Sequence, residues 1–214
     1  MCKKVTALIM LMLTCVLAGC GQEKTAQISS VSVTKDGTVK QQIVGSFEQS
    51  YYELDGLRRL ADDRVSAYTA EHGEKSVMLD SLEEKDGQIV IDFTYLSVKD
   101  YTAFNHRELY AGSVAQAKAE GYVLDNIAFI STKNEPYEPG AIEGLDDMSI
   151  VIIATRPGEE LNVNVYGNVL YINQSAMSTV DVDFNGKKSA HIVNVETGQE
   201  ETAEEASLSY MIFQ

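Results

Sequence analysis

The motif with the clearest chemical meaning is Asp181-Val182-Asp183-Phe184-Asn185-Gly186, in which oxygen-bearing side chains alternate and a glycine follows. This spacing is typical of the first half of a calcium-binding loop, where carboxylate and amide oxygens ligate the ion and the glycine permits a sharp turn. The twelfth position of a complete loop holds a bidentate glutamate, but here it is Ile192. A loop without that ligand would hold a cation only weakly.

The same residues also predict a β-hairpin with its turn at Asn185-Gly186, because apolar and acidic side chains alternate before the turn. A three-residue loop would pair apolar positions with each other and would place His191 opposite Asp181. The apolar pairs would be Ala190 with Val182 and Ile192 with Val180. We favour this hairpin over the calcium loop.

The three histidines, His72, His106 and His191, are far apart in the sequence and none lies in a metal-binding spacing. His72 precedes Gly73, where a cation would favour the end of a helix. The chain has no Gly-x-Ser-x-Gly nucleophile motif and no glycine-rich phosphate loop. The sequence therefore predicts no catalytic residue, no metal ligand and no cofactor.

The N-terminal segment has the pattern of a secretory signal. The basic pair Lys3 and Lys4 precedes an uncharged, mostly apolar run over residues 5–19, which ends in the small residues Ala18 and Gly19 before Cys20. This run is too short for a membrane span, which needs about 20 residues. We expect the chain to be exported.

The tetrad Leu17-Ala18-Gly19-Cys20 resembles the lipobox of bacterial lipoproteins. The resemblance implies that a diacylglyceryl group is attached to the Cys20 thiol, that the chain is cut before Cys20, and that the protein lies at the outer face of the cell membrane. Cys2 and Cys15 would leave with the signal, so the folded part would have no free thiol. A cysteine nucleophile, a disulfide and a thiolate metal site are then excluded.

The chain is strongly acidic. Residues 1–19 carry two lysines and no acid, so their removal changes the formal net charge from −15 to −17. Such a surface repels phosphates, so we exclude nucleic acid as a partner. The remaining partners are the membrane, through the lipid on Cys20, and an envelope protein or a small ligand.

The order of segments along the chain predicts one good-sized domain or two small ones that share a core. We expect the following parts: a signal peptide at 1–19, a lipidated tether at 20–30, a hairpin-helix-hairpin part at 31–130, an acidic proline-containing loop at 131–147, and a mainly β part at 148–214, packed on the first. The loop is long enough to be functional or mobile, and Tyr137 in it is the aromatic residue that we expect to be most exposed.

Two Lys-Asp-Gly turns, at residues 35–37 and 85–87, predict β-hairpins because apolar residues alternate on both sides of each turn. Between them, Ser50-x-x-Glu53 has the form of a capping box, and apolar residues then follow at helical spacing up to Gly73. The charged residues of this helix, such as Arg58 and Arg64, are expected to face solvent.

After the second hairpin, Ser97 and Ser113 are expected to cap two short helices. The remaining expected elements are strands at 123–130, 148–154 and 208–213, a hairpin from 161 to 172 around Gly167-Asn168, and the hairpin around Asn185-Gly186. Together they predict an α+β fold with a mostly antiparallel sheet built from hairpins, one main helix and two short helices.

The segment from Ser97 to Tyr122, together with the lipobox and the Lys-Asp-Gly turns, resembles uncharacterised lipoproteins of anaerobic Gram-positive bacteria. The matching residues are Asp100-Tyr101, Phe104-Asn105, Gly112-Ser113-Val114, Ala117 and Gly121-Tyr122. The resemblance implies an architecture and a role for Cys20 but no activity. We therefore expect a membrane-anchored, non-enzymatic binding or scaffolding domain, and keep two alternatives open, namely a cation-binding module using Asp181, Asp183 and Asn185, and a cell-envelope hydrolase with a dispersed active site.

Overall fold

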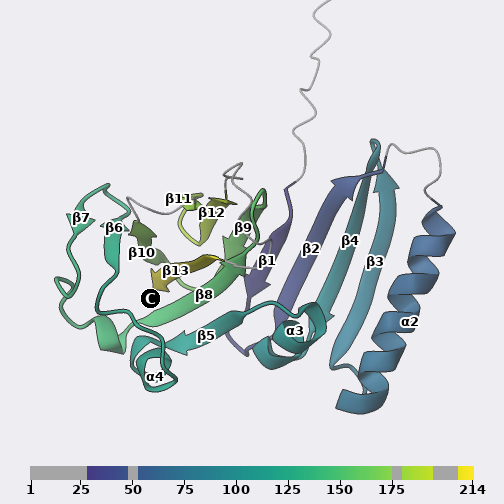
Figure 1. The fold of residues 1–214 in the computed structure, drawn as a ribbon, viewed down its shortest axis with the longest axis horizontal. Helices are drawn as coiled ribbons and strands as arrows, with labels where there is room; N and C mark the ends of the chain where they lie inside the picture. Colours follow the sequence, from purple (N-terminus) through teal and green to yellow (C-terminus); the bar gives the residue numbers. More distant parts are fainter. Residues whose placement is uncertain (1–27, 48–52, 175–179, 195–206) are drawn as a thin grey trace, which may run out of the picture.

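The computed structural model describes residues 28–47, 53–174, 180–194 and 207–214, which form an α+β fold with two mostly antiparallel β-sheets. In Figure 1, β2, β4 and β3 of the first sheet are seen face on at the right beside α2, whereas β11 and β12 of the same sheet lie at the left, next to strands of the second sheet. The predicted fold class is confirmed.

The first sheet has seven strands in the order β11-β12-β9-β1-β2-β4-β3. Neighbouring strands are antiparallel except β1 and β9, which are parallel. The bounds are β1 Ser30–Val33, β2 Val39–Ser46, β3 Val77–Lys85, β4 Gln88–Tyr95, β9 Glu160–Asn164, β11 Val180–Phe184 and β12 Ser189–Asn194.

The second sheet has six strands in the order β5-β8-β13-β10-β6-β7, all antiparallel. Its strands are β5 Leu109–Ser113, β6 Ala128–Ser131, β7 Pro136–Tyr137, β8 Ser149–Thr155, β10 Val169–Gln174 and β13 Ser207–Phe213. Both sheets contain strands from before and from after residues 131–147. That segment therefore does not separate one sheet from the other.

The described residues contain three α-helices, α2 Leu54–His72, α3 Val98–Asn105 and α4 Val114–Ala119, and one 3-10 turn, η1 Leu145–Asp147. The two short helices begin as predicted, because the Ser97 and Ser113 side chains accept hydrogen bonds from the backbone N–H groups of Asp100 and Gln116. Ser50 lies outside the described residues. The residue before the first turn of α2 is Glu53, whose side chain makes no capping hydrogen bond.

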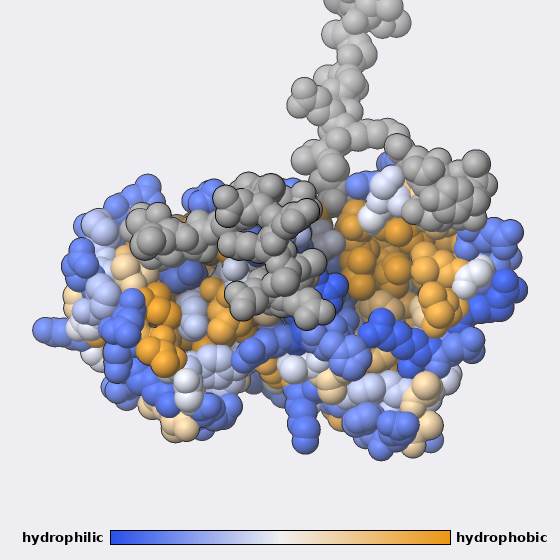
Figure 2. Space-filling view, in the orientation of Figure 1, coloured by the Kyte–Doolittle hydropathy of each residue, from blue (hydrophilic) through white to orange (hydrophobic). Residues whose placement is uncertain are grey.

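Two clusters of buried side chains form the core. The larger cluster lies between the apolar face of the first sheet and one face of the second sheet, and it includes residues of α3. The smaller one lies on the other face of the second sheet, under α4 and the segment that contains residues 131–147. α2 packs along β3, so hydrophobic side chains over β2 and β4 are visible beside it in Figure 2.

Several local predictions are confirmed. The two Lys-Asp-Gly hairpins form, and the second turn has positive φ at both Asp86 and Gly87, which is the two-residue turn that suits the twist of the flanking strands. Gly73 ends α2 with a φ of 102°. The central strand and the C-terminal strand appear as β8 and β13, and β8 is almost entirely buried.

The hairpin predicted around Gly167-Asn168 is wrong. β9 belongs to the first sheet and β10 to the second, so the two strands do not pair. The connecting turn is held from elsewhere, because the N–H groups of Val165 and Val169 donate to the carbonyls of Lys188 and Lys187. The strand predicted at 123–130 is also shorter, since β6 begins only at Ala128.

The prediction for the acidic loop needs correction, and two exposed arginines of the main helix make contacts that the sequence pattern does not show. Residues 131–147 contain β7 and η1, and Ile142 is buried in the smaller core cluster, so this segment is packed. Arg58 donates to the carbonyl of Leu82 at 2.6 Å, and Arg64 donates to the carbonyl of Phe104 and lies over its ring. Both arginines are exposed, as the sequence pattern predicts, and the ends of their side chains also connect α2 to the rest of the molecule.

Candidate functional site

The strongest candidate site is a cavity of about 430 Å³ between β11 of the first sheet and β6 and β10 of the second. We call this cavity the β11 groove. It brings together two segments that the sequence singled out, the Asp181 motif and the start of the 131–147 segment. Its lining residues are Ala128, Ile130, Asn134, Ile172, Asn173, Val180, Asp181, Val182, Asp183 and Phe184.

One wall of the groove is β11, every residue of which lines the cavity. Asp181 and Asp183 are exposed, whereas Val182 and Phe184 are half-buried and pack against the larger core cluster. This is the alternation that the sequence predicts for a strand with one face on the core. Since both faces of β11 contribute to the lining, the groove runs along the edge of the strand.

The hairpin around Asn185-Gly186 is confirmed, but its predicted register is wrong. The strands pair Val182 with Ile192, Asp183 with His191 and Phe184 with Ala190, so His191 lies opposite Asp183 instead of Asp181. The loop also lies one residue further along the chain than predicted, because the bond from the Asn185 N–H to the Ser189 carbonyl leaves residues 186–188 as the loop. Apolar residues still face apolar residues, which is the rule that the predicted register was meant to satisfy.

The other wall comes from the second sheet and is held by local hydrogen bonds. Asn173 is buried, and its Oδ1 accepts a hydrogen bond from the Tyr210 N–H at 2.9 Å. Asn134 lies in the turn between β6 and β7 with a φ of 61°. The Ser131 hydroxyl accepts from the N–H groups on either side of Asn134, those of Lys133 and Glu135, and so fixes this turn.

The three proposed calcium ligands do not lie together in the structure. Asp181 and Asp183 line the groove, but Asn185 does not, and its Nδ2 donates to Asn162 Oδ1 at 3.1 Å. Ile192 is buried in the core. Within residues 28–47, 53–174, 180–194 and 207–214, no three His, Cys, Asp or Glu side chains are arranged to hold a metal ion.

The histidines lie in three different settings. His72 ends α2 as predicted, and its ring stacks on Tyr68 with 3.9 Å between ring centroids. His106 follows α3 in a left-handed conformation. His191 lies on β12, where Nε2 is 3.0 Å from a Glu160 carboxylate oxygen and Nδ1 is 3.1 Å from Asn162 Oδ1.

A second cavity, of about 290 Å³, lies beside α4 and is lined by the end of the 131–147 segment. Lys118 is one of its lining residues, and its Nζ lies 2.8 Å from Asp146 Oδ1 and 3.0 Å from Asp125 Oδ1. The hydrogen bonds to Asp146 and then Asp125 raise the pKa of Lys118 above its usual value. Because this lysine connects α4 to two neighbouring segments, we interpret the cluster as a structural contact.

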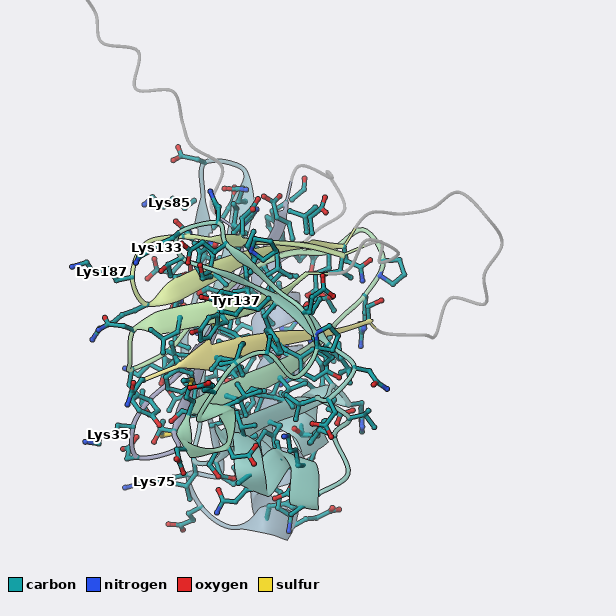
Figure 3. All side chains as sticks on the ribbon, turned by 90° about the vertical axis from the view of Figure 1, so that its left-hand side faces the viewer. Lys35, Lys75, Lys85, Lys133, Tyr137 and Lys187 are labelled. Carbon is teal, nitrogen blue, oxygen red and sulfur yellow. The ribbon has the colours of Figure 1, made fainter. Side chains whose placement is uncertain are left out.

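Tyr137 is less exposed than the sequence suggests. It is half-buried, and its ring packs edge-on against Tyr171 at 5.2 Å. Figure 3 shows the contrast with five lysines that project outward along one side of the molecule, namely Lys35, Lys75, Lys85, Lys133 and Lys187. The expectation that Tyr137 is the most exposed aromatic residue is therefore not supported by its packing.

Sequence reasoning missed the groove itself, because its walls lie far apart in the chain and only the Asp181 motif carried a local signal. Cys20, the predicted lipid-attachment residue, lies outside the described residues. None of the helices that the structure describes has the length and apolar character needed to cross a bilayer. No protein-family model, no curated protein and no solved structure matches the chain.

Proposed function

We propose that the chain is a lipid-anchored, extracytoplasmic binding protein that holds its ligand in the β11 groove and acts by binding rather than by catalysis. The lipobox-like tetrad ending at Cys20 supports the anchor, and the net charge supports a ligand other than nucleic acid. The groove is the single observation that carries the binding role.

The groove has the properties of a ligand site. Its volume of about 430 Å³ falls within the range of about 300–1,000 Å³ that small-molecule and cofactor sites occupy. Its lining combines six apolar side chains with two amides and two carboxylates, so an apolar surface is provided with a few polar groups that can orient a ligand. It also lies where two sheets meet, which gives it walls from separate parts of the fold.

The anchor is tested by Cys20→Ala. In a bacterial host that lipidates exported proteins, the wild-type chain should fractionate with membranes and carry a diacylglyceryl mass on its mature N-terminus. The variant should remain uncleaved or leave the membrane fraction. Normal processing with unchanged membrane association in the variant would contradict the proposal.

The binding role is tested by crosslinking in living cells. A photoreactive amino acid in place of Asp183 should yield a discrete adduct, because this side chain is exposed on the wall of the groove. The matched control carries the same amino acid in place of Asp62, which is exposed on α2 and does not line the groove. An absence of adducts at position 183, or equal adducts at both positions, would refute the groove as the ligand site.

A further inference from the structure

We propose that the edge of β11 binds an extended segment of a partner protein in which apolar and basic residues alternate, and that this segment adds to the first sheet as a further strand. The inference rests on the proposed function, because it names the class of ligand that the β11 groove takes.

The backbone of β11 points hydrogen-bonding groups into the groove. Among the described strands β11 has one neighbour, β12, and so forms an edge of the sheet. The bond from the Asn185 N–H to the Ser189 carbonyl fixes the alternation of the antiparallel pair. Asp183 and Asp181 therefore bond to β12, whereas the N–H and C=O groups of Val182 and Phe184 point away from it.

These outward groups are what an added strand requires. An exposed edge is a template for a further strand, and strand addition gains affinity from main-chain bonds and specificity from alternate side chains. Val182 and Phe184 lie in the C-terminal part of β11, so the added segment would pair along that part of the strand. The cavity beside it supplies the space in which such a segment would lie.

The side chains of β11 define which residues the partner carries. On one face an added strand would lie beside Asp181 and Asp183, and on the other beside Val182 and Phe184, with Ile130 of β6 forming part of the opposite wall. Cross-strand pairs of opposite charge and of apolar residues are favourable. The matching sequence alternates lysine or arginine with aliphatic residues.

The charge of the groove favours the same partner. Of the described residues that line it, the charged ones are Asp181 and Asp183, and none is basic. Lys133 and Lys187 lie in the nearby turns but are not part of the lining, and Figure 3 shows them projecting outward from the molecule. A basic strand would thus meet two carboxylates without an opposing lysine.

Two other occupants fit less well. A second copy of β11 would place its own aspartates against Asp181 and Asp183, and like charges on facing strands are destabilising. Residues 195–206 of this chain carry five glutamates and would add the same repulsion. The partner is therefore a basic segment of another protein.

The test uses the purified full chain in a non-ionic detergent and a synthetic peptide of alternating lysine and valine, titrated by calorimetry. A peptide of the same composition with its lysines and valines in separate blocks, and the alternating peptide with N-methylated backbone amides, should each bind at least about tenfold more weakly. Equal binding of the alternating and block peptides would refute strand addition, since only total charge would then matter.

Variants of the protein locate the site. Asp181→Asn with Asp183→Asn should weaken binding of the alternating peptide by about tenfold, which corresponds to two charge pairs of modest strength. The matched control, Asp62→Asn with Asp63→Asn on α2, changes the net charge equally and should leave binding unchanged. Equal losses in both variants, or a chain that sediments as a dimer through β11, would overturn the proposal.

The failure of this inference can be told apart from failure of the proposed function. Adducts at position 183 without binding of the alternating peptide would refute strand addition and leave the groove as a ligand site of another kind. An absence of both would remove the groove as a binding site altogether.

Discussion

Two fully buried tyrosines offer a sharp test of the structure, because they are in contact and differ in one respect. Tyr95 and Tyr101 have no exposed surface, and their rings pack edge-on at 5.2 Å. The Tyr95 hydroxyl donates to Gln41 Oε1 at 2.6 Å. Among the residues that the structure describes, the Tyr101 hydroxyl has no hydrogen-bond partner. Replacing each by phenylalanine keeps the ring and removes only the hydroxyl.

The two substitutions should change the free energy of unfolding in different directions. Tyr95→Phe loses a buried hydrogen bond and removes a partner from Gln41, which is also buried, so it should lower stability by about 2 kcal/mol. Tyr101→Phe removes a buried polar group that has no partner, so stability should be unchanged or rise by up to about 1 kcal/mol. The expected difference between the variants is about 2–3 kcal/mol.

Urea denaturation of the wild-type chain and both variants, followed by circular dichroism, measures this difference. The slope against urea should be the same for all three proteins, because no apolar surface changes. Equal destabilisation by both substitutions would refute the argument, since it would mean that the Tyr101 hydroxyl is bonded in solution. The candidate partner would then be Arg107, whose charge already opposes the effect of burial on the Tyr101 pKa.

Three further predictions concern stability. Arg107 donates to both Glu159 carboxylate oxygens at 2.7 Å, and both side chains are largely buried. Arg107→Ala should therefore lower the free energy of unfolding in urea by about 2–3 kcal/mol. A loss below about 0.5 kcal/mol would contradict a structural role for the pair. Burial raises the pKa of Tyr101 to about 12 and also raises that of Tyr95. The folded state then keeps protons that the unfolded state releases above the usual tyrosine pKa. Stability should therefore be complete below about pH 10 and fall above it by about 1.4 kcal/mol per pH unit for each such tyrosine. Tyr101→Phe should reduce the slope of stability against pH by about the contribution of one tyrosine. Ile142→Ala should cost about 2–4 kcal/mol, whereas a free loop would show no change in its urea midpoint.

Predictions from the sequence are right where structure is decided by neighbouring residues. The Asp86-Gly87 turn needs positive φ at two positions, and few residue pairs supply that at low cost. The serines that cap α3 and α4 act on N–H groups three residues away. In each case the interacting residues are at most three positions apart in the sequence, so the sequence pattern is sufficient to predict the turn or the cap.

The predictions fail where pairing partners are distant. The sequence from 161 to 172 predicts a hairpin, yet β9 pairs with β1 and β12 whereas β10 pairs with β13 and β6. The turn between them is set by the C-terminus: the Asn168 N–H donates to the Gln214 carbonyl, and a Cβ on Gly167 would lie 2.8 Å from that same oxygen. The glycine that looks like a hairpin turn residue is required by a close approach of another segment.

The candidate site illustrates both cases. The alternation of Asp181 and Asp183 with apolar residues predicts the strand and its exposed carboxylates, and the structure has both. The groove exists only because Ile130 and Ile172, from strands of the other sheet, lie opposite that strand. The residues around Asp181 do not indicate which strands of the other sheet lie opposite them. The calcium-loop hypothesis arose because the sequence shows the motif without these neighbours.

The position of the groove also limits where its partner can be. Ser30, the first residue of β1, is the tenth residue after Cys20, and ten residue steps of extended chain reach at most about 33–36 Å. β11 is three strands away from β1 in the same sheet, a lateral separation of about 14 Å. With lipid on Cys20, the groove would therefore stay within a few nanometres of the membrane surface. A partner strand must then belong to a protein at that surface, or to a short peptide that diffuses to it. The negative charge of the whole chain would attract the basic residues of this strand before it pairs with the edge of β11.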